Sequence, residues 1–152
     1  MPCLVIENVS KSFGGVRALD GVSFSIDDGE LVGLIGPNGS GKTTLINILS
    51  GHLAPDSGRV LLDGNSIEGL PPAELARRGV MRMFQLTRVF PRMSVIDNLM
   101  VAGCALGLPQ SEAEERAWKL VEDLSLTRVA ALDAGQLSGG QQKLLEFGSC
   151  FM

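Results

Sequence analysis

Apolar and polar positions along the first third of the chain favour short strands separated by turns. The runs LVIENVS (4–10) and VSFSI (22–26) mix β-type apolar residues with polar ones, and each is closed by glycine or acidic turn residues. The run ELVGLIG (30–36) is nearly continuous in apolar residues, which is typical of a strand covered on both faces, as in a parallel α/β sheet. We therefore predict a strand in each of these runs.

The pattern changes to a helical one directly after the third run. Apolar residues recur at helical spacing between Lys42 and Ser50, and Gly51 stands where a C-terminal cap belongs. Beyond this helix, the pattern predicts a strand and hairpin turn over 58–64, a short helix over 71–78 and a further strand over 80–84.

Helical segments replace strands after about residue 85. A helix over 94–103 begins with a Ser94/Asp97 capping pattern, and a helix over 111–124 begins with a Ser111/Glu114 capping box. An apolar stripe marks the buried side of the second helix, formed by Ala113, Ala117, Leu120, Val121 and Leu124. We expect a β-rich part with a glycine loop over 1–85, a helical subdomain over 86–141, and the start of a further helix over 142–152.

Composition places the chain among folded proteins and excludes several classes of function. The 152 residues suffice for one domain or part of one, with 45% hydrophobic and 20% charged residues. No apolar run reaches the roughly 18 residues of a membrane span, and no signal peptide opens the chain, so we expect a cytoplasmic location. The net charge is −4 with scattered Lys and Arg, which gives no reason to expect nucleic-acid binding. The three cysteines, Cys3, Cys104 and Cys150, have no CxxC spacing and are expected to be reduced thiols.

The glycine loop carries the strongest chemical pattern. Residues 36–44 read GPNGSGKTT and match GxxxxGK[ST] between a predicted strand and a predicted helix. Glycines let backbone N–H groups converge on a phosphate chain, and the N-terminus of the helix favours negative charge. Lys42 would meet the β- and γ-phosphates, and the Thr43 hydroxyl would meet Mg²⁺. The pattern predicts nucleotide binding but is shared by GTPases, kinases, helicases and transport ATPases.

A second pattern, LSGGQ at residues 137–141, favours a helix start that is open to a ligand. Ser138 and Gln141 have the spacing of a capping box, and the two glycines between them let an outside group approach the N–H groups of the first turn. A helix cap without any ligand is the alternative.

Together, the glycine loop, LSGGQ and a glutamine between them resemble the signature set of the ABC ATPase family over nearly the whole chain. The resemblance implies an α/β fold with a P-loop core, an N-terminal antiparallel β part and a helical subdomain. It also implies ATP and Mg²⁺ as cofactors, head-to-tail pairing with a second nucleotide-binding domain of the same or another chain, and transmembrane permease subunits as partners on the cytoplasmic face of the plasma membrane. In such a pair, LSGGQ of one domain closes on the ATP held by the other.

The resemblance also assigns single residues. Phe13 looks like the aromatic on which the family stacks adenine, and a core phenylalanine at a strand end is the alternative. Gln85 looks like the glutamine whose amide reaches Mg²⁺ and the attacking water, with an idle polar loop residue as the alternative. The catalytic residues implied are Lys42, Gln85, Ser138 and Gly140, and the metal ligands are Thr43 and Gln85. The implied nucleotide-binding residues are Phe13, Gly36, Pro37, Asn38, Gly39, Ser40, Gly41, Lys42, Thr43, Thr44, Gln85, Ser138, Gly139, Gly140 and Gln141.

The stretches 13–24 and 76–103 resemble most closely the ATP-binding subunits of branched-chain amino acid importers. ABC ATPases of DNA repair or translation fit less well, because no coiled coil or basic segment is visible.

The carboxylates that hydrolysis requires are not found in the sequence. The family follows LSGGQ with an apolar run and then Asp-Glu, and no Asp-Glu pair occurs among these residues. Val60, Leu61, Leu62 and Asp63 come nearest, but Gly64 follows and indicates a hairpin turn. The family's switch histidine has no match either, since His52 directly follows the first helix and is interpreted as a surface loop residue. We therefore expect a C-terminally incomplete domain whose final helix runs to the last residue. The alternatives are an ATPase subunit in a longer form and an inactive nucleotide-binding fragment.

Overall fold

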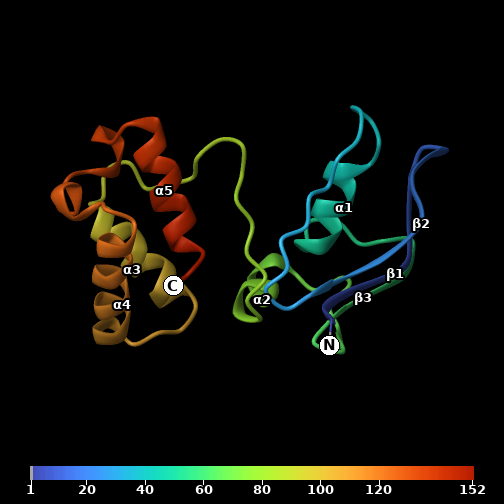
Figure 1. Ribbon diagram of the computed structural model, residues 1–152, viewed down its shortest axis with the longest axis horizontal. Coiled ribbons are helices and arrows are strands. Elements are labelled where there is room, and N and C mark those ends of the chain that lie inside the picture. Colours follow the sequence, from blue (N-terminus) through green and yellow to red (C-terminus); the bar gives the residue numbers. More distant parts are fainter. Residues whose placement is uncertain (1) are drawn as a thin grey trace. The chain divides into compact units, whose positions relative to one another are not determined.

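A computed structural model describes residues 2–152 of the chain, with the side chain of Pro2 excepted (Figure 1). The chain forms two compact units, one ending at Val80 and the other spanning Met81–Met152. Each unit has its own hydrophobic core. The units are described separately below.

The first unit is built on a twisted antiparallel sheet. Strands β1 (Pro2–Phe13) and β2 (Val16–Asp27) form a hairpin in which Phe13 pairs with Val16. The two residues between them, Gly14 and Gly15, both have positive φ, as a tight hairpin of this kind requires. Strand β3 (Ser57–Leu62) pairs with the other edge of β1, and β4 (Asn65–Ser66) follows it through a second tight turn, giving the order β2-β1-β3-β4. The strands predicted in 4–10 and 22–26 and the hairpin turn predicted over 58–64 are confirmed.

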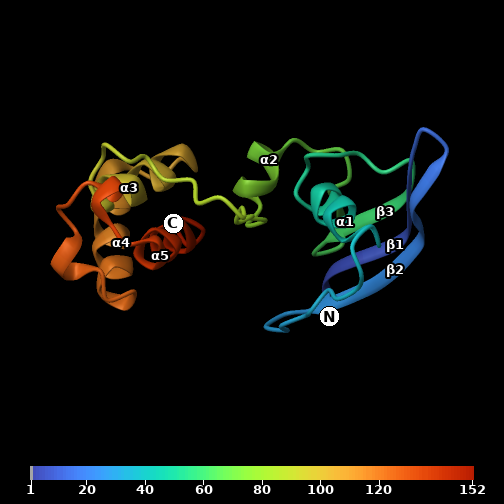
Figure 2. The same ribbon diagram turned by 90° about the horizontal axis from the view of Figure 1, so that it is seen from above.

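Two helices complete the first unit. Helix α1 (Lys42–Leu49) and helix α2 (Pro72–Arg77) begin and end close to the predicted bounds. In both views of the molecule α1 lies beside the sheet (Figures 1 and 2). Leu45 and Ile48 from α1 share a core with strand and loop residues; that core comprises Ile6, Val9, Leu19, Leu45, Ile48, Val60, Ile67 and Leu75.

Two predicted strands are absent from the part of the chain that the structure describes. The segment 30–36 is extended but belongs to no sheet, with Leu31 fully exposed and Ile35 92% exposed. The segment 80–84 likewise carries no strand. A strand exists only through hydrogen bonds to a neighbouring strand. Among residues 2–152 the strand pairs are β1 with β2, β1 with β3 and β3 with β4, and all three are antiparallel. The parallel pairing expected for 30–36 was therefore wrong for this structure.

The second unit is helical. Helix α3 (Val95–Ala105) packs against α4 (Gln110–Asp123) and α5 (Gly139–Ser149), and two 3₁₀ turns, Thr127–Val129 and Ala134–Gln136, lead into α5. The predicted stripe of α4 faces the core, with Ala113, Ala117 and Val121 fully buried. None of the described helices is both long enough and apolar enough to cross a membrane.

Helix boundaries in this unit confirm the predicted caps of α3 and α5 and correct two other expectations. Ser94 caps α3 by accepting a hydrogen bond from the Asp97 backbone N–H, as predicted. The capping box at Ser111 was wrong, because α4 begins at Gln110 after Pro109, whose extended backbone ends the preceding loop. Helix α5 ends at Ser149 and does not run to the last residue, since Met152 turns back and its side chain lies over Gly103 on α3.

Candidate functional site

The glycine loop of residues 36–41 connects the extended segment to the first residue of α1. Gly39 and Gly41 have φ of 82° and 86°, values that residues with a Cβ rarely adopt. A Cβ at Gly41 would also collide with the carbonyl oxygen of Ala18 and lie 2.8 Å from Cδ2 of Leu19. The loop therefore passes closer to β2 than any other residue type would allow, which explains why glycine stands at this position.

The ammonium group of Lys42 lies among atoms of this loop. Its Nζ donates hydrogen bonds to the carbonyl oxygens of Gly36 and Pro37, at 2.8 and 2.6 Å, and to the hydroxyl of Ser40 at 3.3 Å. All three acceptors are electron-rich oxygens arranged around one positive charge. Phosphate oxygens carry full negative charge and bind an ammonium group more strongly than carbonyl oxygens do. The loop therefore holds a cation whose present acceptors are weaker than a phosphate oxygen would be.

The first turn of α1 adds further donors. Gly41 is the N-cap and, having no side chain, leaves the N–H groups of the first turn uncapped, while its own carbonyl accepts from Leu45. Thr43 is exposed and Thr44 is half-buried. Pro37, Asn38, Gly39 and Ser40 are exposed as well, so the loop is open to a ligand. A cavity of about 280 Å³ adjoins it, lined by loop residues and by Leu19, Val22 and Leu45.

Phe13 lies in the same unit, at the end of β1. Its side chain is 49% exposed, so it is not a core phenylalanine. Lys11 places its ammonium 5.9 Å from the ring centroid, and the Asp56 carboxylate holds that ammonium at 2.6 Å. Asp56 also accepts from the Ser12 backbone N–H at 2.7 Å. The Lys11 hydrogen bond, followed by that of Ser12, lowers the pKa of Asp56 below its ordinary value.

Gln85 lies in the second unit, in the loop that precedes α3, and it is exposed. The guanidinium carbons of Arg82 and Arg88 lie 4.9 and 3.8 Å from the ring centroid of Phe84, the residue before Gln85. Two guanidinium groups thus lie over the aromatic ring of the residue that precedes Gln85.

The start of α5 has the predicted capping box. Ser138 Oγ accepts from the Gln141 N–H at 3.3 Å, and the Gln141 side chain accepts from the Ser138 N–H at 2.9 Å. Gly139 and Gly140 are exposed, with open space where a Cβ would stand. The helix therefore presents an accessible, glycine-lined N-terminus, as the sequence predicts.

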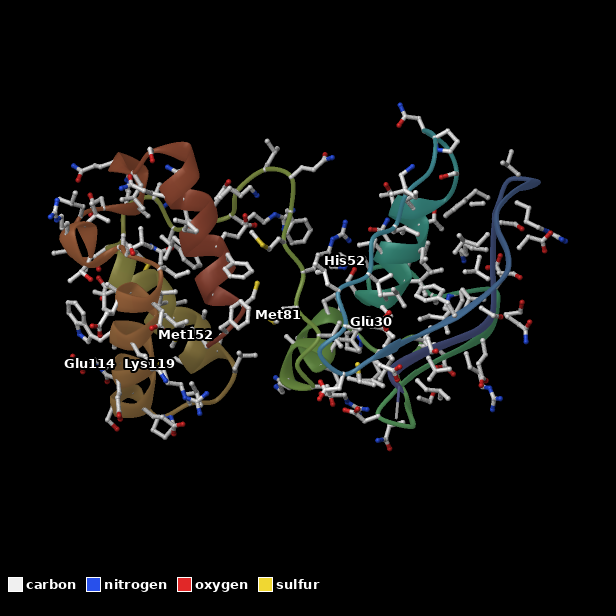
Figure 3. All side chains as sticks on the ribbon, in the orientation of Figure 1. Glu30, His52, Met81, Glu114, Lys119 and Met152 are labelled. Atoms are coloured by element: carbon white, nitrogen blue, oxygen red, sulfur yellow. The ribbon has the colours of Figure 1, made fainter. Side chains whose placement is uncertain are left out.

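The structure groups the candidate residues by unit. The glycine loop, Thr43, Thr44 and Phe13 lie in the first unit, and Gln85 and residues 138–141 lie in the second. His52, directly after α1 (Figure 3), contacts Ser50 through its ring nitrogen and lies apart from the phosphate loop in the sequence. Among the described residues, no group of three or more His, Cys, Asp or Glu side chains is placed to hold a metal ion.

Sequence reasoning missed two carboxylates, Asp56 and Glu146. An acidic residue inside the apolar run LLEF was the available clue to Glu146.

Comparisons with known proteins agree with one another. A family model described as ABC transporter matches residues 19–152. A probable branched-chain amino acid transport ATP-binding protein LivG from Methanocaldococcus jannaschii is 41% identical, with 100% of this chain and 64% of the relative covered. The high-affinity branched-chain amino acid transport ATP-binding protein BraF from Pseudomonas aeruginosa is 39% identical, with 99% and 65% covered.

Solved structures give the same result. A nucleotide-free ATP-binding cassette from an ABC transporter has a TM-score of 0.85 at 39% identity, covering 99% of this chain and 65% of that chain. The ADP conformation of an ATP-binding cassette has a TM-score of 0.86 at 39% identity, with the same coverage. This chain thus spans about 65% of the length of the proteins it matches.

Proposed function

The chain belongs to the ABC transporter family, and on that premise we propose that it is the ATP-binding part of a transporter subunit that uses ATP to drive the import of branched-chain amino acids. The observation that carries this proposal is the Lys42 ammonium, held by three oxygens of a loop in which Gly41 leaves no room for a Cβ. The substrate class is taken from relatives near 40% identity whose names state branched-chain amino acid transport.

The glycine loop would bind phosphate by an exchange of the hydrogen-bond acceptors of Lys42. Lys42 gives up the carbonyl oxygens of Gly36 and Pro37 and donates to phosphate oxygens, while the uncapped N–H groups at the start of α1 donate to the same anion. The exposed ring of Phe13 offers a face for the adenine base. Mg²⁺ prefers oxygen ligands, and the Thr43 hydroxyl and the Gln85 amide oxygen are the groups that the family resemblance assigns to it.

ATP hydrolysis is the activity that membership of the family implies. The Asp-Glu pair that would follow an apolar run is not present in these 152 residues, so the chain itself is proposed to bind ATP without turning it over. Steady phosphate release by the purified chain, above that of its Lys42→Ala variant, would contradict this part of the proposal.

The proposed partners are a second nucleotide-binding domain and permease subunits at the cytoplasmic face of the membrane. The open N-terminus of α5, with Ser138, Gly139, Gly140 and Gln141, is the surface proposed to close on the partner's nucleotide. Sedimentation of the chain with membranes only when permease subunits are co-expressed is the expected behaviour, and equal sedimentation without them would count against it.

The direct test of the nucleotide site is a calorimetric titration of the chain and of its Lys42→Ala variant with ATP. Losing a charge-assisted hydrogen bond weakens binding, and we expect the affinity to fall about tenfold or more. Lys119→Ala is the matched control, because Lys119 lies on the exposed side of α4 (Figure 3) and should leave ATP affinity unchanged. Equal affinity of the wild type and a folded Lys42→Ala would refute the assignment.

A further inference from the structure

Glu146, in the third turn of α5, is an acidic residue that is only 6% exposed. A buried carboxylate is costly unless it is paired and hydrogen-bonded. Lys143, one turn earlier, donates to it at 2.8 Å, and the backbone N–H groups of Phe84 and Arg88 donate to it as well, the first at 3.2 Å. Burial raises the pKa of Glu146, but these hydrogen bonds outweigh burial and hold the pKa below its ordinary value. The carboxylate is therefore ionised at neutral pH.

Lys143 makes a second contact with the same loop. Its Nζ donates to the carbonyl oxygen of Phe84 at 2.5 Å. That carbonyl belongs to the peptide bond that joins Phe84 to Gln85. The N–H and the C=O of Phe84 are thus each held by a side chain of α5, and the backbone at Gln85 is fixed to the helix that begins at Ser138.

The other end of the loop is fixed to α3. The buried Asn98 side chain accepts from the Phe90 N–H at 2.7 Å and donates to the Phe90 carbonyl at 3.0 Å. Both ends of the loop 84–90 are therefore anchored by buried side chains, whereas the side chain of Gln85 between them is exposed. An exposed residue on a loop held at both ends has its position set by the anchors.

The Lys143–Glu146 pair has the i,i+3 spacing of an ordinary helix-stabilising ion pair. Such a pair, when exposed, contributes little to stability and needs no contact outside its helix. Here both members also bind the backbone of a loop that is distant in the sequence, and the acceptor is buried. Those contacts are the feature that an ordinary ion pair does not explain.

We propose that Glu146 and Lys143 are positioning residues that tie the Gln85 loop to the LSGGQ helix, so that the loop and the Ser138 end of α5 move together. A force applied to the loop by a partner would then reach the LSGGQ motif through one rigid helix. The functional meaning of this link rests on the proposed roles of Gln85 and Ser138.

The test is limited trypsin digestion of the 152-residue chain without nucleotide, with the fragments identified by mass. Cleavage after Arg88 reports opening of the loop, and cleavage after Lys119 reports opening of the helical unit as a whole. The measured ratio is the rate of cleavage after Arg88 divided by the rate of cleavage after Lys119. In Glu146→Ala this ratio should rise about tenfold, because hydrogen bonds to a charged group are lost. Glu146→Gln keeps an acceptor for the Phe84 N–H and should give a smaller rise.

Two further sets of variants separate the loop anchor from the ion pair. Lys143→Met should raise the ratio above the wild-type value, and Lys143→Arg, which keeps the positive charge, should give the wild-type value. Glu112→Ala, the matched control, breaks the 2.7 Å ion pair with Arg116 on α4 and should leave the ratio unchanged. In the exchanged double variant Lys143→Glu with Glu146→Lys, the ion pair is regained but no acceptor stands at position 146, so the ratio should stay high.

A wild-type ratio in Glu146→Ala, or its recovery in the exchanged variant, would overturn the proposal. If Glu146→Ala loosens the whole unit, both cleavage rates rise together and its ratio is not informative. The ratios of Glu146→Gln and Lys143→Met then test the proposal: values above the wild-type ratio support it, and wild-type values overturn it. Since no nucleotide is present, this result is independent of whether ATP binds to the glycine loop.

Discussion

Lys42 and Gly41 are adjacent residues with different tasks in the proposed site. Lys42 supplies the charge, and its three oxygen partners hold it within the loop. Gly41 supplies the space, because the backbone of β2 stands where its Cβ would be. The charge was predictable from the sequence pattern, whereas the close approach of the loop to Ala18 was visible only in the structure.

The residue-scale prediction compares alanine at two glycines of the loop. Gly41→Ala adds a collision with the Ala18 carbonyl to the strain of a positive φ. Urea unfolding monitored by circular dichroism should therefore show that the free energy of unfolding falls by more than about 1–3 kcal/mol. Gly39→Ala has a similar φ but nothing within 4 Å of the added Cβ, and it should cost only the strain, roughly 1 kcal/mol. Equal losses in the two variants would show that the contact with β2 is unimportant.

At the scale of elements, local signals were predictable and distant pairing was not. The pattern predicted strands within β1 and β2 and the hairpin turn over 58–64, and the Ser138/Gln141 spacing predicted the start of α5. The run 30–36 has the apolar character of a strand but has no strand partner among residues 2–152. Apolar composition indicates that a segment tends to be buried, but it does not indicate which other segment it pairs with. Asp56 and Glu146 were missed for the same reason, because their partners are distant in the sequence.

The element-scale prediction compares two serines near helix starts in the second unit. Ser138→Ala removes the cap of α5 and should lower the free energy of unfolding by about 1 kcal/mol. Ser111→Ala should change it by less than about 0.5 kcal/mol, because Ser111 lies inside α4 and makes no cap. Urea unfolding followed by the fluorescence of Trp118 on α4 measures both. A larger loss for Ser111→Ala would show that the helix start at Gln110 is misplaced.

At the scale of the whole molecule, the candidate residues are distributed over two units with separate cores. The glycine loop and Phe13 belong to the unit that ends at Val80, while Gln85 and LSGGQ belong to the other. The sequence resemblance assigned these roles together, but the relatives that the chain matches are longer than the chain. ATP binding by the first unit is therefore the central claim that the chain itself can test.

The most direct measurement is an NMR titration of the ¹⁵N-labelled chain with ATP. The account predicts the largest and saturable shifts at the backbone amides of Gly39, Gly41, Lys42 and Thr43, with smaller shifts near Phe13, because the N–H groups of the loop and of the first turn of α1 would donate to the phosphates. Inorganic triphosphate should reproduce the loop shifts without those near Phe13. Absence of loop shifts at saturating ATP, or saturable shifts confined to other parts of the chain, would contradict the account.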